Sequence, residues 1–122
     1  MNISVRIVFV AVAAVIVAGT IVAFLLGRQR SARYYPEARA VVDKHCVACH
    51  SIHTTVPAFP VAAGGVRLDT ADEMRRGAER ILVRTVVEQN MPLLTRTGMT
   101  AAERAVLARW IEAGATVPRS SR

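Results

Sequence analysis

The sequence predicts an all-α fold in which one N-terminal transmembrane helix precedes one small helical domain. An uncharged apolar run from Ile7 to Leu26 predicts the transmembrane helix. In three later segments, apolar residues recur at the three- and four-residue spacing that is typical of amphipathic helices. A length of 122 residues leaves room for a single folded domain after the apolar run.

The apolar run has the length that a membrane-spanning helix needs. Its 20 residues include only Gly19 and Thr20 outside the apolar set, and at the helical rise they cover about 30 Å, the thickness of a bilayer core. A cleaved signal peptide would have a shorter apolar region ending in a small-x-small site, whereas this run meets Gly27 and Arg28. We therefore expect residues 1–27 to be an uncleaved membrane anchor.

A polar segment follows the anchor, and its charges bear on orientation. Residues 28–35 are expected to form a short linker that keeps the next domain close to the membrane. This flank carries three arginines against Arg6 on the N-terminal side, so the positive-inside rule weakly favours a cytoplasmic C-terminus. The domain is expected over residues 36–116, and residues 117–122 are expected to be a flexible tail.

The first helix of the domain is predicted to start at Pro36, which suits the first turn of a helix, and to lead into a cysteine motif. Cys46, Cys49 and His50 form Cys-x-x-Cys-His, the attachment motif of c-type haem, and include both cysteines of the chain. Residues three apart on a helix share a face, so the two thiols can bond to two vinyl groups on one porphyrin edge. His50 can then direct a ring nitrogen at the iron.

Three other kinds of chemistry could use the residues of this motif. A thioredoxin-like redox pair would need a βαβ context and would leave His50 without a role. A structural zinc site has enough donors if His45 and His53 join, but zinc usually takes its second ligand pair from further along the chain. A disulfide across two helical residues has poor geometry. Haem attachment is therefore the predicted chemistry.

The segment after the motif is predicted to be an irregular loop, because it combines prolines with the pair Gly64-Gly65. A backbone carbonyl in this loop could orient His50 by accepting from its second ring nitrogen, and Pro57 is the predicted partner. A second helix is expected around Met74. Its apolar neighbours recur at helical spacing, so Met74 is predicted to be a core residue.

Met91 is predicted to be the second axial ligand of the iron. It lies in the sequence Asn-Met-Pro, where Asn can close a helix and Pro prevents its continuation, so the side chain projects from an irregular loop. Met99 is the runner-up. It precedes a capping box formed by Thr100 and Glu103, and its predicted role is an apolar contact where the last helix begins.

The last helix carries Trp110 on its apolar face and is expected to end near Gly114. Trp110 is predicted to pack in the core against the first helix. Outside the anchor the chain has few aromatic residues, so one haem would supply much of the apolar bulk that the core needs.

Charge and patterning narrow the choice of partners. Arg6 is the only charged residue before Arg28, so residues 28–122 hold +6 of the formal net charge of +7, which suits an acidic docking face on a protein partner. Nucleic acid is not expected, because the arginines are spread along helix faces without interleaved aromatic residues. No acid–base constellation is indicated, so we expect neither a small-molecule substrate nor enzymatic activity from this chain alone.

Together these motifs resemble the class I cytochrome c family. The order of the Cys46–His50 motif, the Asn90–Pro92 loop and a capped helix with Trp110 matches that family. The stretch from Gln89 to Arg104 is most similar to the C-terminal cytochrome c domain of the bacterial membrane-bound urate hydroxylases. The likeness covers roughly residues 34–115.

The resemblance implies a small all-helical domain around one covalent haem c that carries single electrons. Cys46 and Cys49 would be the attachment points, His50 the proximal and Met91 the distal iron ligand. Haem attachment in this family takes place outside the cytoplasm, which implies a single-pass protein of the bacterial inner membrane whose haem domain faces the periplasm. Its redox partners would be membrane-bound or periplasmic proteins. One span replaces the polytopic module of the urate hydroxylases, so no urate chemistry carries over.

Two alternative functions differ in how the haem is used. A five-coordinate haem would make the domain a peroxidase or a sensor module. A haem subunit of a larger membrane oxidoreductase would instead use the anchor to dock into a partner.

Overall fold

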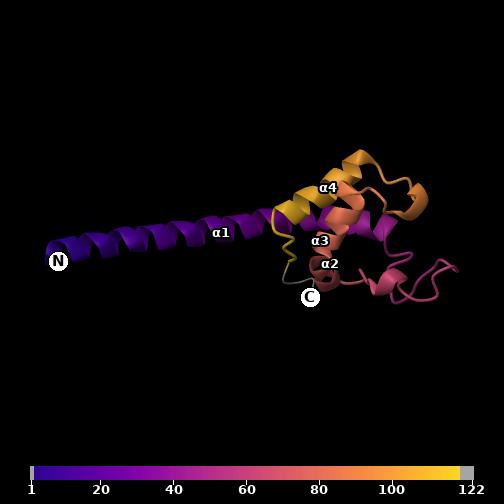
Figure 1. The fold of residues 1–122 in the computed structure, drawn as a ribbon, viewed down its shortest axis with the longest axis horizontal. Coiled ribbons are helices and arrows are strands. Elements are labelled where there is room, and N and C mark those ends of the chain that lie inside the picture. Colours follow the sequence, from indigo (N-terminus) through magenta and orange to yellow (C-terminus); the bar gives the residue numbers. More distant parts are fainter. Residues whose placement is uncertain (1, 119–122) are drawn as a thin grey trace.

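The computed structural model describes residues 2–118, and every regular element in that range is a helix (Figure 1). The predicted all-α class is thereby confirmed. The elements are α1 (Ile3–His45), the 3₁₀ turn η1 (Ala63–Gly65), α2 (Ala71–Arg76), α3 (Ala78–Ile81), the π-helical η2 (Leu82–Val87), the 3₁₀ turn η3 (Leu93–Thr95) and α4 (Ala101–Glu112). The N-terminal part of α1 extends alone, and the remaining elements gather around its C-terminal part (Figure 1).

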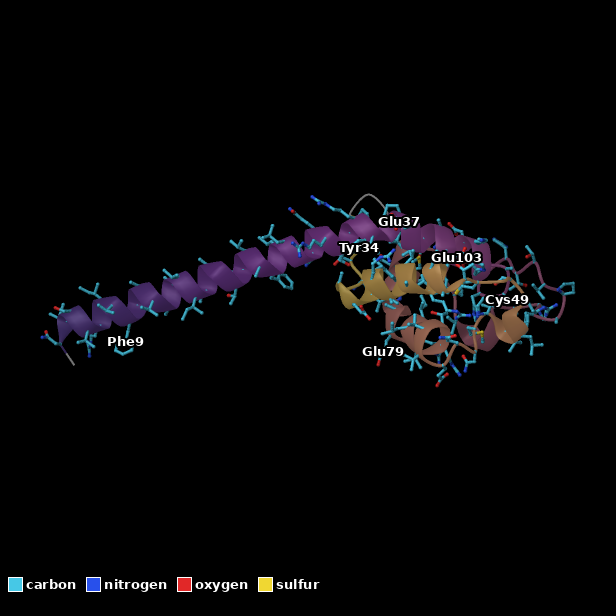
Figure 2. The ribbon with its side chains drawn as sticks, turned by 90° about the horizontal axis from the view of Figure 1, so that it is seen from above. Phe9, Tyr34, Glu37, Cys49, Glu79 and Glu103 are labelled. Carbon is cyan, nitrogen blue, oxygen red and sulfur yellow. The ribbon has the colours of Figure 1, made fainter. Side chains whose placement is uncertain are left out.

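The extended part of α1 contains the apolar run. With 43 residues the whole helix is about 64 Å long, roughly twice the thickness of a bilayer core. Its N-terminal part is apolar, exposed and long enough to cross a membrane. Large apolar side chains, Phe9 among them, project from it without meeting another element (Figure 2). A helix that is apolar on every side needs an apolar environment, which a bilayer would supply.

The structure corrects the predicted linker, because α1 runs unbroken through residues 28–35 and past Pro36. Ser31, Tyr35 and Ala38 recur at helical spacing and are buried against the helical domain. Their burial continues the helix beyond the apolar run, while the arginines of this segment lie exposed. The domain therefore begins near Ser31, and the supposed linker is one wall of its core.

α4 packs along the C-terminal part of α1, and these two helices form the main pair of the domain (Figure 1). Trp110 is fully buried, as predicted, and its ring centre lies 6.2 Å from that of Tyr35 in α1. Ser31 connects the same helices, because its hydroxyl donates to the carbonyl of Trp110 at 3.3 Å and accepts from the N–H of Thr116 at 2.8 Å. The domain is thus bonded directly to the helix that carries the apolar run.

Both ends of α4 lie where the sequence predicts them, but the predicted flexible tail of residues 117–122 does not begin where it was expected. Thr100 and Glu103 form the predicted capping box, and Gly114 follows the end of the helix with a φ of +110°. Val117 is buried in the core, so the predicted flexible tail does not begin there. Residues 119–122 of that tail lie outside the described residues.

The predicted second helix is broken into three pieces. α2 ends at Arg76, and Gly77 follows it, where an added Cβ would lie 3.3 Å from both the carbonyl oxygen of Glu73 and the Leu68 side chain. α3 follows, and the chain then widens into the π-helical η2. Met74 is fully buried, as predicted.

Candidate haem-binding site

The cysteine motif lies in the turn that ends α1, at the end of the domain far from Phe9 (Figure 2). The N–H groups of Cys49 and His50 both donate to the carbonyl of Cys46, at 3.1 and 2.9 Å, which closes one helical turn. This turn lets both cysteines and the imidazole line the same cavity.

The state of the thiols bears on the alternative chemistries. Neither cysteine is in a disulfide, and burial raises the pKa of Cys46 to about 12. A thiol that stays protonated is a poor redox nucleophile, because that role needs the thiolate. The described residues also hold no group of three or more His, Cys, Asp or Glu side chains that could bind a metal ion. The zinc and thioredoxin-like interpretations thus gain no support.

The cavity lined by the motif, which we name the motif cavity, has a volume of about 470 Å³, within the range of cofactor sites. Its wall is mainly apolar, and Met91 lies in it together with the motif residues. The motif turn, the loop around η1, the α3–η2 segment and the Met91 loop enclose the space. Two thiols for attachment, with an imidazole and a thioether as candidate iron ligands, match a covalent haem of the His/Met type.

A backbone carbonyl orients His50, but it is not the predicted one. The Nδ1 atom of His50 lies 3.2 Å from the carbonyl oxygen of Val66, which corrects the prediction of Pro57. The chain between residues 63 and 68 runs back along the motif, because the N–H of Leu68 donates to the carbonyl of His50 at 2.8 Å. Pro57 is exposed, outside the cavity wall. Since a carbonyl only accepts, Nδ1 carries the proton and Nε2 keeps the lone pair that can bind a metal.

Asp69 directly follows residues 63–68 and holds the end of that segment in place. No feature of the sequence distinguishes Asp69 from the other acidic residues. Its carboxylate accepts from the Ser51 hydroxyl and from the N–H of Ile52 at 2.9 Å. The hydrogen bond from Ser51 holds the pKa of Asp69 below its usual value. The residues just after His50 are thereby tied to the same segment that orients its ring.

The two candidate methionines occupy different places. Met91 is half-buried and lines the motif cavity, whereas Met99 is not part of its wall. Met99 belongs to the hydrophobic core cluster that includes Leu107 and Trp110, consistent with its predicted contact where α4 begins. The geometry therefore favours Met91 as the sulfur donor.

Arg104 holds the Met91 loop against the rest of the domain, a role that the sequence does not reveal. From α4, its guanidinium donates to the carbonyl oxygens of Met91, at 2.9 Å, and of Thr85. One side chain thus connects α4, η2 and the loop that carries the sulfur. Hydrogen bonds from a charged donor are stronger than those between neutral groups, so Arg104 adds to the bond that the Met91 N–H donates to the Arg84 carbonyl at 3.1 Å.

Three arginines also line the motif cavity: Arg80, Arg84 and Arg96. Arg84 is paired with Glu88 at 3.0 Å. Arg80 and Arg96 form no ion pair with any carboxylate of the described residues. Their guanidinium groups are available to the carboxylates of a ligand.

His45 ends α1 and is buried beside the cavity, where it meets α4. Its Nδ1 lies 2.7 Å from the Thr97 hydroxyl, and its Nε2 lies 3.0 Å from a carboxylate oxygen of Glu103 at an angle that forms no hydrogen bond. Lys44 donates to Glu103 at 2.7 Å. This bond, followed by the one from the backbone of Thr100, keeps the pKa of Glu103 well below its usual range.

No protein-family model matches the chain, and no curated protein or solved structure is similar to it at a significant level. Cys46, Cys49, His50 and Met91 come together at the motif cavity, while Pro57 and Met99 lie outside its wall.

Proposed function

We propose that this chain is a membrane-anchored cytochrome with one covalent haem c, which carries single electrons between membrane-bound or periplasmic redox partners. The observation that carries the proposal is that Cys46, Cys49, His50 and Met91 line one apolar cavity of about 470 Å³. When bound, the haem would supply an iron that cycles between the ferric and ferrous states.

Each residue of the site has a separate task in this proposal. Cys46 and Cys49 hold the porphyrin covalently. His50 presents its Nε2 atom to the iron, with its ring fixed through Nδ1 by the carbonyl of Val66. Met91 supplies a sulfur ligand. If His50 and Met91 both hold the iron, no ligand position would be left for a substrate, so the chain would act as a carrier and not as an enzyme.

The surroundings of the site suit the rest of the cofactor. Arg80 and Arg96 have no carboxylate partner in the described chain and can pair with the two haem propionates. The mainly apolar wall would limit the access of water to the iron. Low solvent exposure and a methionine ligand both favour a relatively high reduction potential.

The apolar part of α1 would hold the protein in the bacterial inner membrane, with the haem domain in the periplasm, where c-type haem is attached. The positive-inside count favours the opposite orientation only weakly. Long loops and whole domains translocate largely regardless of such a bias, so the attachment chemistry outweighs the charge count.

A visible spectrum of the full-length protein, produced in cells that attach c-type haem and extracted in mild detergent, tests the proposal. We expect haem absorption that survives denaturation and a weak red-end band of the ferric form that marks sulfur ligation. Replacing both cysteines (Cys46→Ser with Cys49→Ser) should abolish the covalent pigment, whereas His53→Ala, at an exposed loop position, should keep it.

Other spectra would lead to other functions. A colourless protein that contains zinc would overturn the haem assignment. A five-coordinate haem spectrum would keep the cofactor but transfer the function to a peroxidase or sensor module. A stoichiometric membrane partner after mild extraction would make the chain a subunit of a larger oxidoreductase, whereas a carrier is expected to purify alone.

A further inference from the structure

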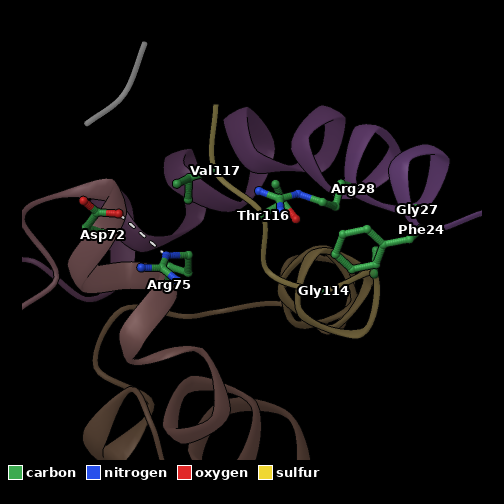
Figure 3. A pocket seen from close by; sticks show the side chains of 9 residues that line it. Phe24, Gly27, Arg28, Asp72, Arg75, Gly114, Thr116 and Val117 are labelled. Atoms are coloured by element: carbon green, nitrogen blue, oxygen red, sulfur yellow. Dashed lines mark ion pairs between the residues drawn. The ribbon is translucent and has the colours of Figure 1, made fainter. Parts of the chain in front are cut away.

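A second cavity lies where the apolar run of α1 ends, and we refer to it as the juxtamembrane pocket (Figure 3). Its volume is about 590 Å³. Phe24, Gly27 and Arg28 of α1 form one wall. Asp72 and Arg75 of α2 also line it, and in this view the chain that follows α4, with Thr116 and Val117, runs between the two groups (Figure 3).

The charges of the juxtamembrane pocket favour an anion. Arg28 forms no ion pair with any described carboxylate, and its guanidinium carbon lies 5.6 Å from the centre of the Phe24 ring. Arg75 meets Asp72 only at 3.6 Å, between side chains that are 54% and 36% exposed, so this pair is weak. Two guanidinium groups against one carboxylate leave a positive charge, and guanidinium groups bind phosphate oxygens well.

The position of the pocket indicates where the anion comes from. Phe24 lies within the uncharged run that ends at Leu26, and Arg28 is the first charged residue after it. In a membrane, this boundary lies at the level of the lipid headgroups. No acidic residue precedes Glu37, so nothing in the adjoining part of α1 repels an anionic headgroup.

We propose that the juxtamembrane pocket binds the headgroup of an anionic phospholipid, with Arg28 and Arg75 on its phosphate and Phe24 beside the start of its acyl chains. The inference rests on the membrane anchor of the proposed function and not on the haem. The lipid would join α1 to α2 where the domain meets the bilayer. A ligand that binds only the folded domain also raises its stability.

The test uses the full-length protein in lipid discs of pure phosphatidylcholine and of an equal mixture with phosphatidylglycerol. Native mass spectrometry measures how much phosphatidylglycerol stays bound, and circular dichroism follows thermal unfolding. We expect retained phosphatidylglycerol and a higher unfolding midpoint in the mixed discs. Arg28→Gln and Arg75→Gln should each weaken lipid retention about fivefold.

Two further variants separate a pocket from general attraction to a charged surface. Gly27→Leu keeps every charge and adds a side chain to the pocket wall, where a Cβ meets no atom within 4 Å, and it should also lower retention. Arg30→Gln removes a charge from the same segment outside the pocket wall and should have a smaller effect than Arg28→Gln. Equal losses from Arg28→Gln and Arg30→Gln, or no loss from Gly27→Leu, would overturn the proposal.

Two controls identify the source of the phosphate and the state of the anchor. If inorganic phosphate raises the unfolding midpoint of the protein in phosphatidylcholine discs as much as phosphatidylglycerol does, the ligand is a soluble anion and the lipid proposal is wrong. A chain that alkaline carbonate removes from membranes would refute the anchor and the lipid site together. An inserted chain that is insensitive to the pocket variants would refute the lipid site alone.

Discussion

The motif cavity and the juxtamembrane pocket lie at opposite ends of the helical domain, and α1 contributes to both. The motif cavity is mainly apolar and holds sulfur and imidazole donors, whereas the juxtamembrane pocket holds two guanidinium groups and one carboxylate. Gly27 and His45 belong to one unbroken helix, which separates the two sites by about 27 Å. One rigid element thus sets the distance between the end of the apolar run and the motif cavity, which a flexible linker would leave undefined.

The largest effect is expected from replacing the methionine of the motif cavity. Met91→Leu removes the proposed sulfur ligand from the motif cavity, so the red-end band of the ferric spectrum should disappear completely. Met99→Leu changes only the core and should keep the band, at a cost below about 1.5 kcal/mol in unfolding free energy. Absorption spectroscopy and urea unfolding measure the two effects. Loss of the band in Met99→Leu alone would exchange the roles of the two residues.

Loss of the Arg104 side chain should affect the motif cavity through the Met91 loop. Arg104→Met leaves the carbonyls of Thr85 and Met91 without their charged donor, which should destabilise the domain by about 2–3 kcal/mol. The red-end band should also fade at a lower temperature than in the wild type. Arg109→Met is the matched control in α4, because its side chain is 51% exposed and its nearest acidic group, in Glu37, lies 3.9 Å away. Equal thermal stability of the band in both variants would rule out a positioning role for Arg104.

A change at the opposite end of the domain should alter stability and leave the spectrum unchanged. Ser31→Ala removes the bonds that join α1 to the end of α4 and leaves the N–H of Thr116 without an acceptor, at a cost of about 1–2 kcal/mol. Urea unfolding measures this loss, and Thr20→Ala, at an exposed position, serves as the control. A shift of the red-end band in Ser31→Ala would show that the two ends of the domain are coupled.

The smallest expected effect concerns pH and the contact between α1 and α4. The pKa of Glu103 is lower in the folded chain than its unfolded value of about 4.3, so its stabilisation is present above that value and is lost as the pH falls below it. Glu103→Gln keeps a side chain that can cap α4 but removes this titration. Unfolding midpoints between neutral and acidic pH should therefore fall less steeply in the variant. Parallel pH profiles would contradict the assignment.

Features that depend on neighbours along the chain follow from the sequence alone. The apolar run, the Cys-x-x-Cys-His spacing, the break at Met91 and the capping box before α4 are all local, and helical periodicity identifies Met74 and Trp110 as core residues. Each depends on residues within about one helical turn, where backbone geometry leaves few alternatives.

Contacts between distant segments were decided only by the tertiary structure. Val66 replaced Pro57 as the partner of His50, Arg104 reached the carbonyl of Met91, and the supposed linker became part of α1 once Ser31 met Trp110, 79 residues away. Every residue has a backbone carbonyl, so the sequence does not show which of them accepts from His50. It also does not show which surface arginine donates to two separate segments. Which of them meet depends on how the helices pack, and local patterns carry no information about that packing.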